Sequence, residues 1–241
     1  MNGLRDAEIV SALASVRTRV HAACEAAGRD PQELTLVAVT KTFPASDVLT
    51  LLRLGVVDIG ENKDQEARAK LADLGELASA QQRAAIRWHL VGRLQTNKAR
   101  TVVRYAHAVH SVDRDGLATA LADAARERRQ TPLEVFVQVS LDDDPGRGGA
   151  PAAALLELAD AVAERAELNL RGVMAVPPIE ADPDMAFGRL AELSAAVRAV
   201  HPGADAISAG MSADLEAAVR HGSTHLRVGS ALLGRRAANF G

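Results

Sequence analysis

The sequence contains little cysteine and few aromatic residues. Cys24 is the only cysteine among 241 residues, which excludes an internal disulfide and a metal site built from several cysteines, and favours a reducing compartment. Phe, Trp and Tyr together make up 2% of the chain, so a stacking surface for nucleic-acid bases is not expected. The formal net charge of −3 adds no electrostatic support for such binding. We therefore expect neither a nucleic-acid partner nor a metal site.

The chain also lacks a long apolar run and a secretion signal. No stretch is long enough and apolar enough to span a bilayer. Residues 1–10, MNGLRDAEIV, lack the basic region, apolar core and small-residue cleavage site of a signal peptide. Apolar residues nevertheless make up 48% of the chain, which allows a sizeable core. These features predict a cytoplasmic globular protein that does not interact with a membrane.

Lysine is scarce as well, and one lysine has an unusual position. Only four of the 28 basic residues are Lys. Lys41 directly follows the mostly apolar run LTLVAVT, residues 34–40. Arg stays protonated in proteins, whereas Lys becomes a nucleophile once burial or a neighbouring charge lowers its pKa. Lys41 is therefore a candidate for covalent chemistry. The alternative is a lysine that extends its ammonium group from a strand end into solvent.

Short runs rich in β-branched residues alternate with helical patterns along the whole chain. The alternation predicts parallel strands, and eight such units in a chain of this length predict an α/β fold, a (β/α)8 TIM barrel forming a single domain over 1–241. The expected strands are 34–39, 56–60, 86–91, 106–112, 133–140, 170–176, 205–210 and 224–229. The expected helices are an extra N-terminal helix, 5–27, and then 45–54, 62–78, 96–105, 114–129, 151–166, 184–200 and 212–221.

Two features leave the strand count and one loop open. The runs 56–60 and 205–210 are short, so the alternative fold is an open doubly wound sheet of seven strands. ALLGRR, after the eighth expected strand, is a candidate start for a last helix. The Gly-rich segment 142–150 lies between a strand and its helix, and is interpreted as a mobile loop rather than a domain boundary.

The carboxyl ends of the expected strands carry polar residues, and barrel enzymes place their chemistry there. Ser212 precedes an apolar helical pattern and is predicted to cap that helix, while Gly229 and Ser230 follow the eighth strand before another predicted helix start. Helix starts with Ser and Gly bind phosphate through backbone N–H groups, and the loops after strands seven and eight are the frequent phosphate site of barrels. We predict a phosphate site here; the alternative is that both serines only cap helices.

A lysine on strand one beside a phosphate site on strand eight suits a phosphorylated aldehyde held as a Schiff base. Pyridoxal 5′-phosphate (PLP) is the first candidate, and a sugar phosphate in a class I aldolase is the second. Arg227 shares a strand face with Gly229 and, if it points at a pyridine nitrogen, it can only donate a hydrogen bond. The ring would then be a poorer electron sink than one paired with a carboxylate. The alternative for Arg227 is a peripheral ion pair.

Several multi-residue motifs resemble the pyridoxal phosphate homeostasis family. They are LVAVTKTFP, IGENKDQE, RWHLVGRLQTNK, HSVD, RGVMAV and SAGMSADLEAAVRHGSTHLRVGSALLG, and they extend from about Leu34 to Gly234. The resemblance implies a fold-type III PLP barrel, similar to the N-terminal domain of alanine racemase, with PLP covalently on Lys41. It also implies that the protein binds and hands over PLP, and so maintains vitamin B6 and amino-acid pools.

The resemblance further assigns residues to the cofactor. Asn62 is expected near the ring and Arg227 at the ring nitrogen, with the phosphate held by Ser212, Gly229 and Ser230. Met174, Ser208 and Met211 are expected to line the pocket. We also include Ser111, from the end of the fourth expected strand, among the cofactor-binding residues.

Little or no turnover is expected. Alanine racemase, by the same resemblance, takes its second base from a tyrosine of a separate C-terminal domain, and this chain is expected to lack that domain. The only tyrosine, Tyr105, lies in the helical stretch before the fourth expected strand, away from Lys41. We therefore predict no catalytic residue, PLP-dependent apo-enzymes as possible partners, and a monomer or weak dimer. The alternatives are a low-specificity PLP-dependent racemase or lyase, with His89 or His110 as second base, and a class I aldolase.

Overall fold

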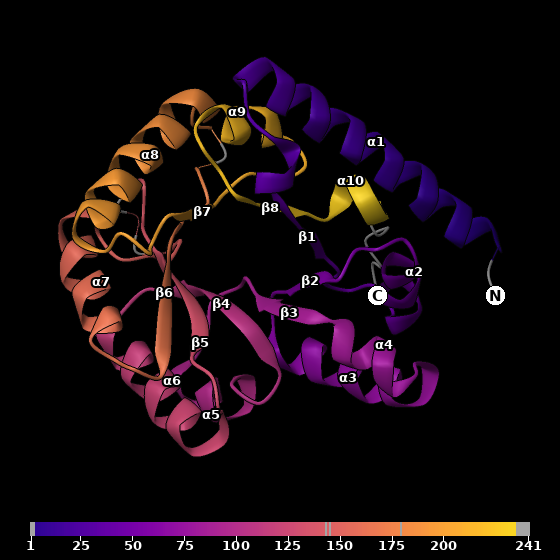
Figure 1. Cartoon of the computed structure of the whole chain (residues 1–241), viewed down its shortest axis with the longest axis horizontal. Helices are drawn as coiled ribbons and strands as arrows, with labels where there is room; N and C mark the ends of the chain where they lie inside the picture. Colours follow the sequence, from indigo (N-terminus) through magenta and orange to yellow (C-terminus); the bar gives the residue numbers. More distant parts are fainter. Residues whose placement is uncertain (1–2, 143, 145, 179, 235–241) are drawn as a thin grey trace.

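Eight parallel strands form a closed barrel in the computed structural model, which describes residues 3–142, 144, 146–178 and 180–234. Each strand pairs with the next one in the chain, and the eighth pairs with the first, as Figure 1 shows. The strands are β1 (Thr35–Val39), β2 (Asp58–Glu61), β3 (Arg87–Leu90), β4 (Ala106–Val112), β5 (Leu133–Gln138), β6 (Leu168–Met174), β7 (Ala206–Ser208) and β8 (His225–Val228). The predicted (β/α)8 barrel is confirmed, and the seven-stranded open sheet is excluded because β1 pairs with β8.

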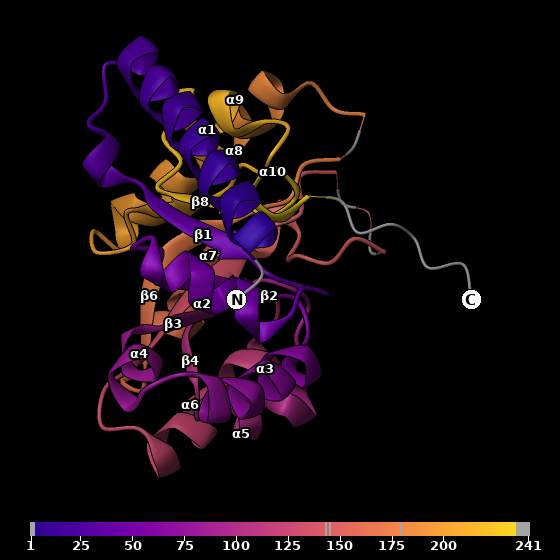
Figure 2. The ribbon, with the colours of Figure 1, turned by 90° about the vertical axis from the view of Figure 1, so that its right-hand side faces the viewer.

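Helices surround the barrel on its outer side. The long helix α1 (Gly3–Ala27) precedes the first strand and packs across the outside of the barrel against α9 and α10, as Figure 2 shows. The other helices are α2 (Ala45–Arg53), α3 (Asp64–Leu77), α4 (Ala80–Ala85), α5 (Ala99–Val102), α6 (Asp115–Arg128), α7 (Leu155–Ala163), α8 (Pro183–Val200), α9 (Leu215–Arg220) and α10 (Ser230–Leu233). Short 3-10 turns occur at Pro31–Glu33, Thr96–Lys98 and Ala152–Ala154. No helix in this part of the chain combines the length and apolar character needed to cross a membrane.

The apolar core has two parts. The larger part lies between strands and helices, and includes Ile9 of α1, Ile59 of β2 and Leu121 of α6. The smaller part is a separate cluster of strand residues, in which Phe136 of β5 packs with Ala108, Met174 and Ala206. His110 stacks on Phe136 with 4.3 Å between ring centroids, so polar residues continue the filling of the barrel from this cluster. Buried polar groups of this kind need hydrogen-bond partners to be tolerated.

The structure corrects some local predictions. Ser212 does not cap the helix that follows it: α9 begins at Leu215, because the Asp214 carboxylate accepts the N–H of Met211 at 2.5 Å and holds residues 211–214 in a turn. Helix α4 was not predicted; it begins with a capping box in which Ser79 and Gln82 bond reciprocally. The predicted last helix corresponds to α10, although residues 235–236 of that stretch lie outside the described part. Residues 143 and 145 of the predicted loop 142–150 also lie outside it.

Candidate functional site

A cavity of about 480 Å³ opens at the carboxyl end of the barrel, and we call it the Lys41 cavity. Its walls come from the ends of β1 and β8 and from the segments that follow β1, β2, β3, β6, β7 and β8. This is the end at which (β/α)8 proteins carry their active sites. The lining residues are Val39, Lys41, Asn62, Val91, Val176, Met211, Ser212, Ala213, Arg227, Gly229 and Ser230.

Lys41 is the second residue after β1, and its side chain is exposed to the cavity. It makes no hydrogen bond or ion pair with any residue that the structure describes, so its ammonium is available to a ligand. The next residue, Thr42, has φ of 65°, a left-handed conformation that is unusual for a β-branched side chain and marks a constrained turn. Its N–H donates to Glu66 at 3.1 Å, which ties the turn to α3.

A buried ion pair supports the residue before Lys41. Lys70 of α3 donates to the Thr40 carbonyl at 2.6 Å and to the Glu61 carboxylate, and the Thr40 hydroxyl donates to Glu61 at 2.5 Å. Burial raises the pKa of Glu61, although its bonds to Lys70 and Thr40 act in the opposite direction. One Glu61 oxygen, Oε2, has no hydrogen-bond partner among the described residues. The Lys70 ammonium of α3 therefore holds the residue that follows β1 in place.

The segments after β7 and β8 meet at one wall of the cavity. The Ser212 hydroxyl accepts the N–H of Ala231, the second residue of α10, at 3.1 Å. Arg19 of α1 donates to the Ser212 carbonyl at 3.0 Å and also binds Glu216, which braces the loop from outside. Gly229 lies against β1: a Cβ there would be 3.1 Å from the Val39 carbonyl oxygen, so glycine allows the close approach. Hydroxyl and backbone N–H groups are thus gathered where a phosphate was predicted.

Arg227 presents a buried guanidinium to the cavity. It is 5% exposed, and its nitrogens donate to the Ser208 carbonyl at 2.5 Å, the Ser208 hydroxyl at 2.7 Å and the Ala175 carbonyl at 2.9 Å. Burial lowers the pKa of Arg227 to about 10. Within the described residues no carboxylate lies within ion-pair distance of it. The predicted alternative, a peripheral ion pair, does not describe its surroundings.

Seven of the ten predicted site residues line the Lys41 cavity, and three do not. Ser208 lies behind Arg227, and Met174 packs in the barrel with Phe136. The Ser111 hydroxyl donates to the Gly92 carbonyl at 2.7 Å. Gly92 packs closely against Asn62, since a Cβ on Gly92 would be 2.2 Å from the backbone carbonyl oxygen of Asn62. Direct cofactor contacts of Ser111, Met174 and Ser208 therefore stay predictions. Ser208 supports Arg227, and Ser111 supports Gly92, which packs against Asn62.

The sequence did not indicate the apolar part of the lining. Val39, Val91, Val176 and Ala213 lie at strand ends or in loops, where residue type alone carries no functional signal. Val176 is also unusual among large apolar residues in being 39% exposed. An apolar residue left open at the carboxyl end of a barrel strand is the signal that could have identified it.

The candidate second bases do not line the Lys41 cavity. The Tyr105 hydroxyl donates to Asp64 of α3 at 3.2 Å, and burial raises the pKa of Tyr105 above its ordinary value. His89 and His110 are buried and hydrogen-bonded to each other at 2.8 Å. Burial also lowers the pKa of His110 well below its usual range. None of the three is placed to exchange a proton with a group beside Lys41.

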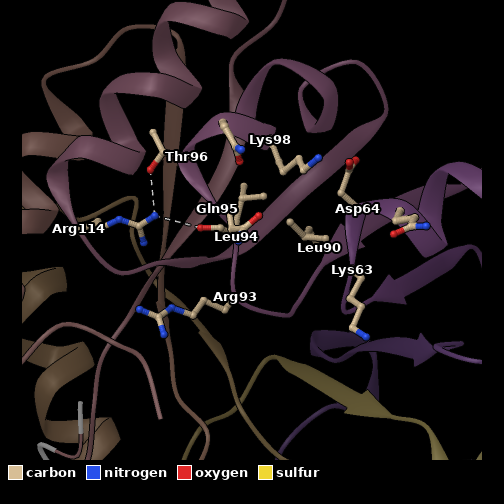
Figure 3. A pocket seen from close by; sticks show the side chains of 11 residues that line it. Lys63, Asp64, Leu90, Arg93, Leu94, Gln95, Thr96, Lys98 and Arg114 are labelled. Carbon is tan, nitrogen blue, oxygen red and sulfur yellow. Dashed lines mark hydrogen bonds between the residues drawn. The ribbon is translucent and has the colours of Figure 1, made fainter. Parts of the chain in front are cut away.

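A second, basic cavity of about 770 Å³ is lined by Lys63 and Leu90, the chain neighbours of Asn62 and Val91 in the first. Its charged lining consists of Lys63, Arg93, Lys98 and Arg114, with Asp64 as the one carboxylate. Figure 3 shows Arg114 donating to the Leu94 carbonyl and the Thr96 hydroxyl, at 3.1 and 3.0 Å. These cations give this side of the barrel mouth a positive potential, which favours the approach of anionic ligands.

The chain matches the family model described as alanine racemase, N-terminal domain, over residues 12–237. An alanine racemase of Clostridium difficile 630 shares the fold, with a TM-score of 0.63 at 12% identity over 86% of this chain and 54% of that one. PipY of Synechococcus elongatus PCC7942, in a structure described with PLP bound, has a TM-score of 0.80 at 31% identity over 94% of this chain and 100% of PipY. The protein is thus a barrel of the alanine racemase N-terminal-domain class.

Similar proteins extend over nearly the whole chain. The pyridoxal phosphate homeostasis protein of Mycobacterium bovis is 48% identical over 243 residues, which cover 96% of this chain and 94% of that protein. The protein of the same name from Escherichia coli K12 is 39% identical over 232 residues, covering 95% and 97%. The chain therefore belongs to the pyridoxal phosphate homeostasis protein family, and the predicted resemblance is confirmed.

Proposed function

We propose that this protein binds PLP in the Lys41 cavity, as a Schiff base on Lys41, and acts in PLP and amino-acid homeostasis with little or no turnover. The observation that carries the proposal is Lys41, which pairs with none of the described residues and lines a cavity together with a buried guanidinium and two serines. The names of the M. bovis and E. coli relatives, and the PLP reported in PipY, support the choice of ligand.

The residues present fit PLP group by group. Lys41 supplies the amine that condenses with an aldehyde, and Ser212 and Ser230 supply hydroxyl groups for a phosphate. Arg227 supplies a donor for a pyridine nitrogen, which it would keep unprotonated. When bound, PLP supplies an electron sink, and pairing with Arg227 rather than a carboxylate makes that sink weak. A weak sink suits retention of the cofactor more than carbanion chemistry.

The composition of the cavity also favours a carrier over a racemase. Among the residues that the structure describes, its lining contains no His, Tyr, Cys, Asp or Glu, so Lys41 and Arg227 are the titratable side chains of that part. Racemisation needs a base on each face of the bound substrate, and within the described residues of the lining only Lys41 is placed to be one. Transfer of PLP to apo-enzymes, a cytoplasmic location and a monomeric or weakly dimeric state remain part of this proposal. Low-specificity racemisation is the alternative outcome.

An absorbance spectrum of the purified protein, before and after hydroxylamine, tests the proposal. A visible band that hydroxylamine removes, and that Lys41→Ala abolishes, is the expected result. Lys98→Ala is the matched control, since this lysine lies in the neighbouring basic cavity, and it should keep the band. Sustained racemisation of an amino acid by the pure protein would replace the carrier by a racemase. If the purified protein contains no PLP, and borohydride links a sugar phosphate to Lys41, both the carrier and the racemase would be overturned in favour of an aldolase.

A further inference from the structure

A continuous line of buried hydrogen bonds leads away from Arg227 through the inside of the barrel. The Ser208 hydroxyl, which accepts from Arg227, is 2.7 Å from His110 Nδ1. His110 Nε2 is 2.8 Å from His89 Nδ1. His89 Nε2 is 2.9 Å from Asp58 Oδ1. Ser208, His110, His89 and Asp58, which we call the relay, come from four different strands and are all less than 10% exposed.

The relay ends at a second opening, at the amino end of the barrel. A cavity of about 460 Å³, which we call the far cavity, includes Asp58 and His89 in its lining. Thr35, Asp58, Arg87 and His225, the first residues of β1, β2, β3 and β8, all line it, so it lies opposite the Lys41 cavity. The remaining lining residues are Glu33, His107, Glu134, Arg171, Asp205, Ala206 and Thr224. The relay therefore joins the two ends of the barrel.

With one proton on each histidine, an ionised Asp58 fixes the direction of every hydrogen bond in the line, and the Arg227 end is consistent with that direction. Arg227 can only donate, and an ionised Asp58 can only accept. Although burial raises the pKa of Asp58, its hydrogen bonds to His89 and Arg87 bring that pKa below the ordinary value. His89 must then donate from Nε2 to Asp58 and accept at Nδ1. His110 must in turn donate from Nε2 to His89 and accept at Nδ1 from the Ser208 hydroxyl.

This arrangement leaves the Ser208 oxygen facing Arg227 with its lone pairs, because its proton is directed to His110. We infer that His110, His89 and Asp58 are positioning residues: they fix the Ser208 hydroxyl as an acceptor, and thereby hold the Arg227 guanidinium against the Lys41 cavity. The effect on the cofactor rests on the proposed function, whereas the histidine tautomers are a property of the chain without any ligand.

A proton added to His110 would reverse the hydrogen bond between His110 and Ser208. A doubly protonated His110 would donate to Ser208, whose oxygen would then lie between two cations and whose own proton would lose its acceptor. Burial and the nearby charge of Arg227 oppose that proton on His110. The groups around the two histidines are Asp58 of β2, Arg87 of β3, His107 of β4, Phe136 of β5, Ser208 of β7, and His225 and Arg227 of β8. Among them Asp58 is the only anion, and it contacts His89 rather than His110. The relay is therefore expected to keep one direction around neutral pH.

Nitrogen-15 NMR of the ligand-free protein tests the inference directly. Both His89 and His110 should carry a proton on Nε2 and have a bare Nδ1. In Asp58→Asn, Arg87 favours the amide oxygen, which turns the amide N–H₂ toward His89 and shifts both histidines toward the Nδ1–H form. Glu134→Gln is the matched control, because it removes a carboxylate from the same cavity but lies outside the relay; it should change neither tautomer. An Nδ1–H form of either histidine in the unmodified protein would overturn the inference.

A second measurement follows PLP on the same variants. Asp58→Asn should release PLP roughly threefold to tenfold faster, as expected for one weakened hydrogen bond to a charged group, while Glu134→Gln releases it at the unmodified rate. Equal rates in all three proteins, with shifted tautomers only in Asp58→Asn, would show that the relay exists but does not position Arg227, and would overturn the inference. If Asp58→Asn does not fold, Ser208→Ala takes its place, with faster release and unchanged tautomers expected. Failure of PLP to bind any of the proteins would instead count against the proposed function.

Discussion

The Ser212 hydroxyl accepts the backbone N–H of Ala231 at 3.1 Å, and this bond joins the loop after β7 to the first turn of α10. The two segments lie on one wall of the Lys41 cavity, together with Gly229 and Ser230. A phosphate at this wall would take over the N–H that Ser212 now accepts, and would also accept from the hydroxyl itself. Under the proposed function Ser212 would shape this wall for an anion, and its observed bond to α10 differs from the cap of the helix 212–221 that its sequence context predicts.

Replacing both hydroxyls should weaken PLP retention. Ser212→Ala with Ser230→Ala removes two donors to the phosphate, and charge-assisted hydrogen bonds are worth about 1.5–3 kcal/mol each. We expect the free energy of PLP binding to fall by a few kcal/mol, measured by equilibrium dialysis. Ser46→Ala, on the exposed start of α2, is the control and should bind normally. Unchanged retention in the double variant would mean that the backbone N–H groups suffice, or that the phosphate lies elsewhere.

Arg227→Lys should weaken PLP binding although it keeps a positive charge. A single ammonium cannot reproduce the fork by which Arg227 reaches the carbonyls of both Ser208 and Ala175. We expect PLP to bind about tenfold more weakly, equivalent to the loss of roughly one hydrogen bond to a charged group. Arg29→Lys provides the comparison, since Arg29 also donates to two carbonyls but faces α9 and the following turn. Equal losses in both variants would point to a general loss of stability rather than a role at the ligand.

Lys70→Met should destabilise the fold more than it alters the cavity. It leaves the Glu61 carboxylate buried without its cation, and breaking a buried pair costs about 3–5 kcal/mol in the free energy of unfolding. Lys63→Met, which loses only an exposed pair with Glu66 at 3.8 Å, should cost less than about 1 kcal/mol. Urea denaturation measures both. Lys70→Met combined with Glu61→Leu should recover most of the loss; a double variant as unstable as Lys70→Met would contradict the electrostatic explanation.

The sequence predicts the fold and most of the Lys41 cavity because both depend on local patterns. Lys41, Asn62 and Gly229 each follow an apolar run, and a barrel brings the carboxyl ends of such runs together whatever their register. Contacts that depend on the register between distant strands are not predictable in this way. Ser208 and His110 are 98 residues apart, and only the closed barrel places them within 2.7 Å. The family resemblance assigns Ser208 to the cofactor pocket, and in the structure Ser208 bonds to Arg227 without lining the Lys41 cavity, so its direct contact stays a prediction.

Acid should destabilise the protein in part through His225. Burial lowers the pKa of His225 to about 3, below the ordinary value of 6.5, so the unfolded chain takes up a proton as the pH falls through 6.5 while the folded chain does not. Stability therefore decreases between those two values, by up to about 1.4 kcal/mol per pH unit for this histidine. Urea denaturation from about pH 6.5 to pH 5.5, above the range in which most carboxylates titrate, measures the slope. His225→Asn should reduce it, whereas replacement of the exposed His21 should not; equal slopes in both variants would locate the acid sensitivity elsewhere.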